Sequence, residues 1–215
     1  HYGDPKGDPE LISAVCWAWE EDFGQPLSDD HVLVSTSSCL GMALTMLAIL
    51  DPGDEVIVFS PYFAVYRSQI ELAGGVCVDV PTYADENYAI DEARLRGDIP
   101  PRTTAIIFNN PANPTGMSYD RDTLSMLARI AQEYDLLIAA DEIYTTYLYE
   151  GDFCPIRTLP GMAQRTITLN SFSKNYLMTG WRVGVIIAEP ELLAVMIRIT
   201  GSLVYTAPSV SQRAA

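Results

Sequence analysis

Lysine, histidine and closely spaced cysteines are scarce in this chain of 215 residues. It has only two lysines, Lys6 and Lys174, and two histidines, against 28 acidic residues, and its formal net charge is -15. Nucleic acid would be repelled by such a field, so we expect no nucleic-acid partner. No group of histidines, cysteines and carboxylates has the spacing of a metal site, and we expect no bound metal.

Long apolar runs are also missing. No segment reaches the roughly 18 uncharged apolar residues that span a bilayer, and the first residues lack the basic and apolar regions of a signal peptide. We therefore expect no membrane association. The cysteines lie far apart without a CxxC pair, which favours buried thiols in a reducing cytoplasm over a disulfide framework: Cys16, Cys39, Cys77 and Cys154.

Apolar, β-rich segments alternate with helical patterns along the chain. Several of these segments are continuous Val, Ile and Leu runs, typical of strands covered on both faces. The predicted strands are 31–35, 55–59, 75–80, 104–109, 136–140, 166–170 and 183–188, and the predicted helices are 11–23, 38–50, 62–73, 120–134 and 190–200. This order predicts an α/β fold, a three-layer α/β/α arrangement around a mostly parallel seven-stranded sheet.

Unusual residues follow several predicted strands, at the end of the sheet where ligands collect in such folds. Ser171, Ser173 and Lys174 follow strand 166–170, and Arg182 comes eight residues later between glycines. Alone, Lys174 would be read as a solvated loop residue. Serine hydroxyls and a guanidinium can hold a phosphate, however, and a lysine beside a phosphate suits a cofactor that forms a Schiff base.

Two further strands end in polar groups. The loop after strand 104–109 contains two Asn-Pro pairs closed by Thr-Gly, and its prolines stiffen the backbone that carries Asn113. Asp141 follows strand 136–140, with Tyr144 three residues on. A helix cap is one interpretation of Asp141; the other is an ion pair with a cationic ring nitrogen, which would keep that ring protonated.

The remaining candidates lie nearer the start. Thr36, Ser37 and Ser38 follow the first strand and open a helix, which makes either an ordinary cap or an anion site. Phe63 belongs to an aromatic segment after the second strand and is either a core residue or a cover for a planar ring.

Taken together, the segments NPANPTG, DEIY and SFSK-x5-GWRVG resemble the pyridoxal-5'-phosphate (PLP)-dependent aminotransferases of class I/II, the fold type I enzymes of the aspartate aminotransferase superfamily. The resemblance runs over essentially the whole chain. It implies a PLP enzyme that moves an amino group between an amino acid and a 2-keto acid. It also implies that Lys174 forms the aldimine with the cofactor and acts as general base, and that Asp141 pairs with the pyridine nitrogen.

The same resemblance implies roles for the other residues. Asn113 and Tyr144 would donate to the cofactor's 3-hydroxyl, and Phe63 would stack on its ring. The phosphate would be held by Thr36, Ser37, Ser38, Ser171 and Arg182, and Ser173 would also bind the cofactor. Tyr2 matches a tyrosine that reaches the phosphate of the partner subunit, which implies a homodimer.

The chain departs from the family in two respects. Ser37 stands where the family usually has glycine, and the chain is about half as long as family members. We therefore expect residues 1–215 to form the PLP-binding large domain, without the N-terminal arm, the C-terminal small domain or the arginine that binds the substrate carboxylate. Three alternatives stay open: a PLP-dependent lyase (β-elimination or decarboxylation), a non-catalytic PLP-binding effector module, and an inactive fragment.

Overall fold

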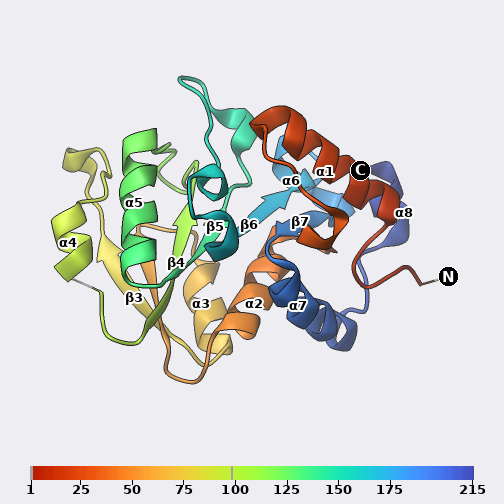
Figure 1. Cartoon of the computed structure of the whole chain (residues 1–215), viewed down its shortest axis with the longest axis horizontal. Coiled ribbons are helices and arrows are strands. Elements are labelled where there is room, and N and C mark those ends of the chain that lie inside the picture. Colours follow the sequence, from red (N-terminus) through yellow and green to blue (C-terminus); the bar gives the residue numbers. More distant parts are fainter. Residues whose placement is uncertain (1, 98) are drawn as a thin grey trace.

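The sheet is the centre of the molecule, which we describe from a computed structural model over residues 2–97 and 99–215. It has seven strands in the order β1-β7-β6-β5-β4-β2-β3 (Figure 1). Their bounds are β1 Val32–Ser35, β2 Glu55–Ser60, β3 Val76–Pro81, β4 Thr103–Asn109, β5 Leu137–Asp141, β6 Thr166–Ser171 and β7 Gly184–Ile187. Only β7 runs against its neighbours β1 and β6, and the other pairs are parallel. The predicted mostly parallel seven-stranded sheet is confirmed.

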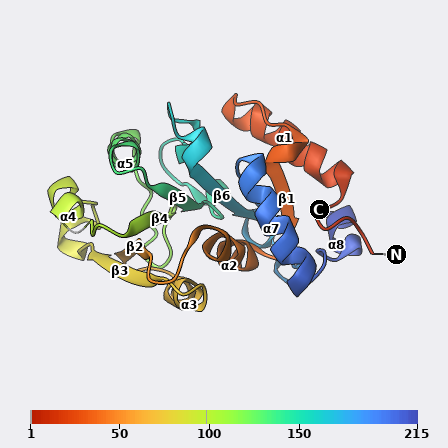
Figure 2. The same ribbon diagram turned by 60° about the horizontal axis from the view of Figure 1, so that its bottom comes forward.

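Helices cover both faces of the sheet. Figure 2 shows α1 and α5 on one side and α2 and α3 on the other. The long helices are α1 Pro9–Phe23, α2 Ser38–Ile49, α3 Val65–Leu72, α5 Arg121–Glu133 and α7 Pro190–Leu203, and the short ones are α4 Glu92–Gly97, α6 Phe172–Asn175 and α8 Ser209–Ala214. The short helices were not predicted, because one or two turns show too little apolar periodicity to be recognised.

Both faces of each central strand are buried, which explains the continuous apolar runs. In β2, Val56 and Val58 pack in the core formed with α2, α3 and α7, whereas Ile57 and Phe59 pack in the core formed with α5. A third core, between α1 and the β1–β7 edge, includes Trp19. The three-layer prediction is therefore confirmed.

Local signals set the helix ends. Asp8 caps α1, since its side chain accepts a hydrogen bond from the Glu10 amide at 3.0 Å, and the helix stops at Gly24 with φ 66°. Helix α3 begins at Val65 and not at residue 62 as predicted, because residues 61–64 form a turn before it. This turn carries Phe63 toward the end of the sheet.

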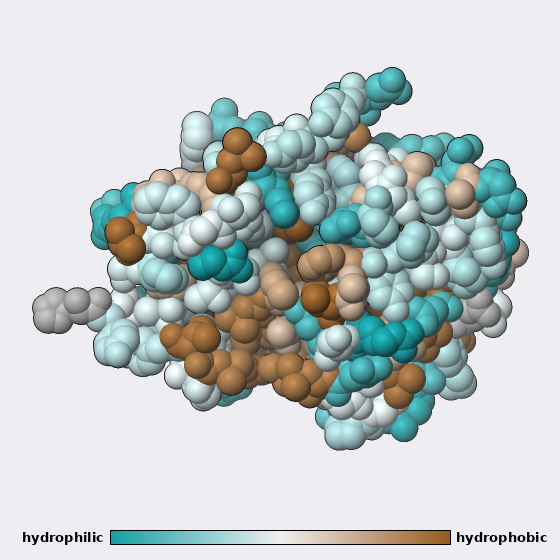
Figure 3. All heavy atoms as spheres, turned by 180° about the vertical axis from the view of Figure 1, so that it is seen from behind, coloured by the Kyte–Doolittle hydropathy of each residue, from teal (hydrophilic) through white to brown (hydrophobic). Residues whose placement is uncertain are grey.

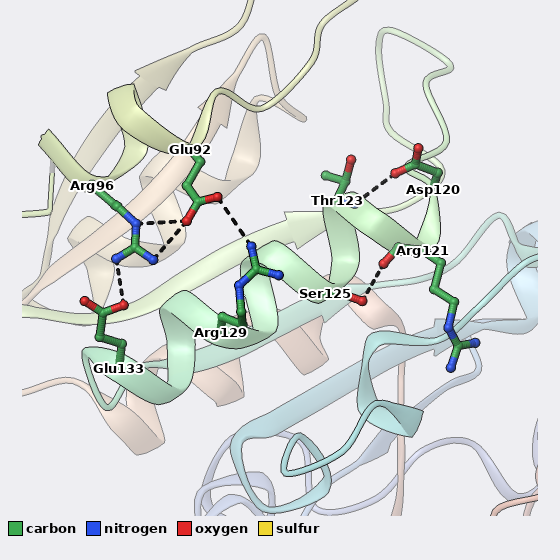
Figure 4. Close-up of polar contacts among 8 residues, drawn as sticks. All are labelled: Glu92, Arg96, Asp120, Arg121, Thr123, Ser125, Arg129 and Glu133. Carbon is green, nitrogen blue, oxygen red and sulfur yellow. Dashed lines mark hydrogen bonds and ion pairs between the residues drawn. The ribbon is translucent and has the colours of Figure 1, made fainter.

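Surface ion pairs tie α4 to α5 (Figure 4). The Arg96 guanidinium lies 2.9 Å from Glu92 and 2.7 Å from Glu133, and Arg129 also reaches Glu92 at 3.4 Å. Each exposed pair contributes at most about 1 kcal/mol, so the network orients α4 more than it stabilises the fold.

The helices on one side of the sheet expose some apolar side chains to solvent. Seen from behind, the lower part of the molecule carries a band of apolar side chains (Figure 3). Exposed large apolar residues include Leu47 on α2, Leu72 on α3 and Leu203 on α7. Within the described residues, no helix is both long and apolar enough to cross a bilayer.

Candidate functional site

A cavity of about 230 Å³ lies at the carboxyl ends of the strands. Its walls come from the β1–α2 junction, the segments that follow β2, β4, β5 and β6, and the loop before β7. Ten of the twelve predicted site residues line it: Ser37, Ser38, Phe63, Asn113, Asp141, Tyr144, Ser171, Ser173, Lys174 and Arg182. Five residues that were not predicted complete the lining: Cys39, Tyr66, Asn109, Ile143 and Thr179.

Two predicted residues lie outside this lining. Thr36 is half-buried at the β1–α2 junction, beside Ser37. Tyr2 is 84% exposed, and its ring packs edge-on against Tyr205 with the ring centres 5.1 Å apart. Tyr2 therefore makes no wall of the cavity in its own chain.

Asp141 is the buried charge of the site. It ends β5, is only 6% exposed, and its Oδ2 accepts a hydrogen bond of 2.5 Å from the Tyr66 hydroxyl. Its other oxygen, Oδ1, is buried without a hydrogen-bond partner among the described residues. Burial raises the pKa of Asp141 to about 6, and the bond from Tyr66 opposes this rise. A carboxylate with one bare buried oxygen fits a cationic group placed in the cavity.

Tyr66 was missed as a site residue because its aromatic segment also fits an ordinary core. It is 1% exposed, and burial together with the charge of Asp141 raises its pKa well above the ordinary value. Its hydroxyl therefore stays protonated and donates to Asp141. The only sequence signal was its place in the same aromatic segment as Phe63, three residues earlier; in the structure the two ring centres lie 5.7 Å apart.

Asn109 joins two parts of the site. Its side-chain NH2 donates to the Asp141 carbonyl at 2.8 Å, and its side-chain oxygen accepts from the Asn113 amide at 2.6 Å. It thus fixes the Asn-Pro loop against the end of β5. Its sequence signal was a polar residue in the last position of a buried strand.

Lys174 lies in α6, directly after β6. Ser171 caps this short helix by accepting from the Ser173 amide at 3.1 Å. The Lys174 amine lies 5.8 Å from the centre of the Tyr144 ring. Burial and the nearby Asp141 raise the pKa of the Tyr144 hydroxyl, whereas Asn113 lowers it. An amine and a phenol therefore face the same space.

The amino end of α2 forms another wall. The Ser37 hydroxyl accepts from the Leu40 amide at 3.0 Å and caps the helix. Its φ is 178°, an extended conformation open to any residue, so serine replaces the family's glycine here without backbone strain. Opposite, Gly184 permits close packing, since a Cβ on it would lie 2.6 Å from the Ser38 nitrogen.

Arg182 brings a positive charge to the same cavity. It has φ 59°, a left-handed conformation that side chains rarely adopt. Its guanidinium donates to the Thr179 carbonyl at 2.8 Å. Helix amides together with a guanidinium make a site for an anion such as phosphate.

The prediction of buried thiols is wrong for most of the cysteines. All four are free, but only Cys16 is buried; Cys77 and Cys154 are half-buried, and Cys39 is exposed. Cys39 is exposed because the first turn of α2 faces the cavity.

The cavity thus joins an anion cradle, a buried carboxylate in need of a cation and a lysine amine, which together suit a phosphorylated cofactor with a basic ring. The comparisons agree with this class. The chain belongs to the aminotransferase class I and II family, whose profile matches residues 1–215.

Named relatives are similar to almost the whole chain. The chain is 37% identical over 212 residues to the aspartate/prephenate aminotransferase of Thermus thermophilus, covering 98% of this chain and 54% of that protein. It is 34% identical over 215 residues to the arginine–pyruvate transaminase of Pseudomonas aeruginosa, covering 100% of this chain and 55% of that protein. The chain spans about half the length of the curated relatives it matches.

Solved structures share the fold. The aspartate aminotransferase of Thermus thermophilus with maleate superposes with a TM-score of 0.95 at 35% identity, covering 99% of this chain and 55% of that one. The aromatic aminotransferase of Pyrococcus horikoshii superposes with a TM-score of 0.97 at 31% identity, covering 100% and 58%.

Proposed function

We propose that residues 1–215 form the PLP-binding large domain of an aminotransferase that moves an amino group between an amino acid and a 2-keto acid. The observation that carries this proposal is the bare, buried Oδ1 of Asp141 in the same cavity as Lys174. Family membership implies PLP as the cofactor. The polar side chains that line the cavity suit the three parts of PLP, which are a cationic ring nitrogen, a hydroxyl and a phosphate. When bound, PLP supplies an electron sink for the α-carbon of an amino acid.

The chain's own residues would then divide the work. Asp141 holds the ring nitrogen in its protonated form, and Tyr66 fixes the carboxylate that does so. Asn113 and Tyr144 orient the 3-hydroxyl, and Phe63 covers the ring. The amine of Lys174, once free, takes the proton from the substrate's α-carbon.

The same cavity could hold the phosphate of the cofactor. The amides at the start of α2, at Ser37 and Ser38, would bind it from one side, and the guanidinium of Arg182 would bind it from another. Ser171 and Ser173 would supply hydroxyls, and Thr36 would support the turn behind Ser37. Held by these groups, a phosphate would keep one orientation, which would help to position the cofactor relative to Asp141 and Lys174.

We further propose a cytoplasmic homodimer. Tyr2 is exposed and lies off its own chain's cavity, as the family role toward a partner's phosphate requires. The free thiols fit a reducing compartment. A lyase, an effector module and an inactive fragment are less well supported, since the named relatives above are aminotransferases.

Reduction with borohydride tests the cofactor site directly. PLP is added, the visible absorbance is followed, and the reduced chain is digested to locate the modified lysine. Label on Lys174 alone is expected, because the amine of Lys6 is paired with Asp30 at 2.9 Å and Lys6 does not line the cavity. Label found on Lys6 as well, or a Lys174→Ala chain that is still labelled, would contradict the assignment of Lys174 as the residue that binds PLP.

Product analysis of the full-length protein then tests the reaction. A keto acid formed together with the aminated acceptor is the expected pair. Pyruvate released with ammonia would establish the lyase in its place.

A further inference from the structure

A group of side-chain hydrogen bonds joins the segment after Tyr144 to the helix that carries Lys174. The 3-10 turn Thr145–Tyr147 lies against α6, although about 30 residues separate them in the chain. We call this group the Asn175 bridge; it consists of Thr145, Thr146, Tyr147, the Lys174 carbonyl and Asn175.

Asn175 is the centre of the bridge. Its side-chain NH2 donates to the Thr145 hydroxyl at 2.8 Å and to the Asn170 side chain at 3.2 Å, and its oxygen accepts from the Thr146 hydroxyl at 3.0 Å. An amide can donate from one atom and accept at the other, which neither a carboxylate nor a hydrocarbon of similar size can do.

Tyr147 adds a bond to the main chain of the lysine itself. Its hydroxyl donates to the Lys174 carbonyl at 3.0 Å. The amide of Tyr147 in turn bonds to the Tyr144 carbonyl at 2.9 Å. A continuous chain of contacts therefore runs from the main chain of Tyr144 to that of Lys174.

Helix α6 needs such support. It has four residues, and a helix of one turn does not hold its own shape. The place of the Lys174 backbone is therefore set by its contacts. These are the Ser171 cap, the main-chain bonds of Phe172 with Val183 and Met178, the Leu177 amide on the Lys174 carbonyl, and the Asn175 bridge.

From this geometry we propose that Asn175 and Tyr147 are positioning residues that keep the Lys174 amine and the Tyr144 hydroxyl in a fixed position relative to each other. The inference rests on the proposed PLP function of the site. Neither residue lines the cofactor cavity, and Tyr147 reaches only a neighbouring pocket beside Tyr144 and Lys174, so each acts mainly through the backbone of a residue that lines the cavity.

Two variants with little change in shape test the proposal. Tyr147→Phe removes only the hydroxyl, and Asn175→Asp keeps the acceptor for Thr146 but loses the donor to Thr145 and Asn170. Tyr83→Phe is the matched control, because Tyr83 is 45% exposed, close to the 38% of Tyr147, and lines neither the cofactor cavity nor the pocket beside it. For each chain we would measure the rate of reaction of Lys174 with PLP, the visible circular dichroism of the bound cofactor and the thermal unfolding of the cofactor-free chain.

The expected result is a slower reaction, by about tenfold, with an altered dichroism signal in both variants, because small displacements of a reacting amine are costly. Tyr147→Phe should unfold near the wild-type temperature, and Tyr83→Phe should match the wild type in all three measurements. A wild-type rate and dichroism in Tyr147→Phe, whatever its stability, would overturn the proposal. A wild-type chain that never binds PLP would instead remove the proposed function as well.

Discussion

Replacing Asp141 by asparagine should stabilise the cofactor-free chain at neutral pH while destroying its affinity for PLP. The pKa of Asp141 is about 6 in the fold against an ordinary 3.8. At about 1.4 kcal/mol per pH unit, keeping this carboxylate charged and buried at pH 7 lowers the free energy of unfolding by roughly 3 kcal/mol. The asparagine amide cannot make all its hydrogen bonds at this buried position, which lowers the free energy of unfolding by about 1–2 kcal/mol. The net gain of Asp141→Asn is therefore about 1–2 kcal/mol.

The pH dependence gives this prediction its sharpest form. A raised carboxyl pKa means that the folded state binds the proton more tightly than the unfolded one. The wild type therefore loses stability as the pH rises from 3.8 to about 6, whereas Asp141→Asn does not. Glu142, whose pKa is raised to about 8 mainly by burial, lowers the stability of both chains as the pH rises, and the two chains differ only by the smaller part of this rise that comes from the charge of Asp141.

Urea unfolding of both cofactor-free chains between pH 5 and 8 measures the difference, above the isoelectric point of about 4.3. The advantage of Asp141→Asn should grow by roughly 1 kcal/mol between pH 5 and pH 7 and then stay level. A constant difference, or a wild type that is more stable at pH 7, would refute the idea that Asp141 is held at a cost for the cofactor.

Three further changes have defined outcomes. Tyr66→Phe removes the hydrogen bond that the Asp141 carboxylate accepts among the described residues, so the pKa of Asp141 should rise further. PLP titrations at pH 7 should then show an affinity about threefold to tenfold weaker. An unchanged affinity would show that Tyr66 does not support Asp141 in binding the cofactor. Cys39 should be the thiol that PLP shields from alkylation, while the half-buried thiols elsewhere react at the same rate with and without cofactor, as peptide mapping would reveal. Gly184→Ala forces a methyl group against the Ser38 nitrogen, so it should lower the free energy of unfolding by about 1–3 kcal/mol and should also weaken phosphate binding. Wild-type values of both quantities would show that β7 and α2 can move apart without cost.

The predictable part of the site follows from one property of parallel sheets. Asp141, Lys174 and Asn113 come from distant parts of the chain, but each follows an apolar run, and the carboxyl ends of parallel strands meet at one edge. Their meeting in one cavity could therefore be expected from the order of the runs alone.

Other features depend on contacts that no local pattern records. The donor to Asp141, Tyr66, looks like any core aromatic until β5 and α3 are adjacent. Asn109 likewise gains its role only when β4 pairs with β5 and places its side chain beside the Asp141 carbonyl. The reversed direction of β7 was not predicted, because an apolar run gives no information on the sense of its pairing.

The position of β7 has a consequence for the order in which the site forms while the protein is being synthesised. In the described sheet, β1 pairs with β7 and so joins the other strands through it. A ribosome releases β1 and the start of α2 first, but their place beside Lys174 exists only after residues 184–187 have emerged more than 140 residues later. The amino end of α2, one wall of the anion cradle, is thus synthesised early but reaches its place late, so a nascent chain cannot bind the cofactor fully until nearly all of this sheet has been synthesised.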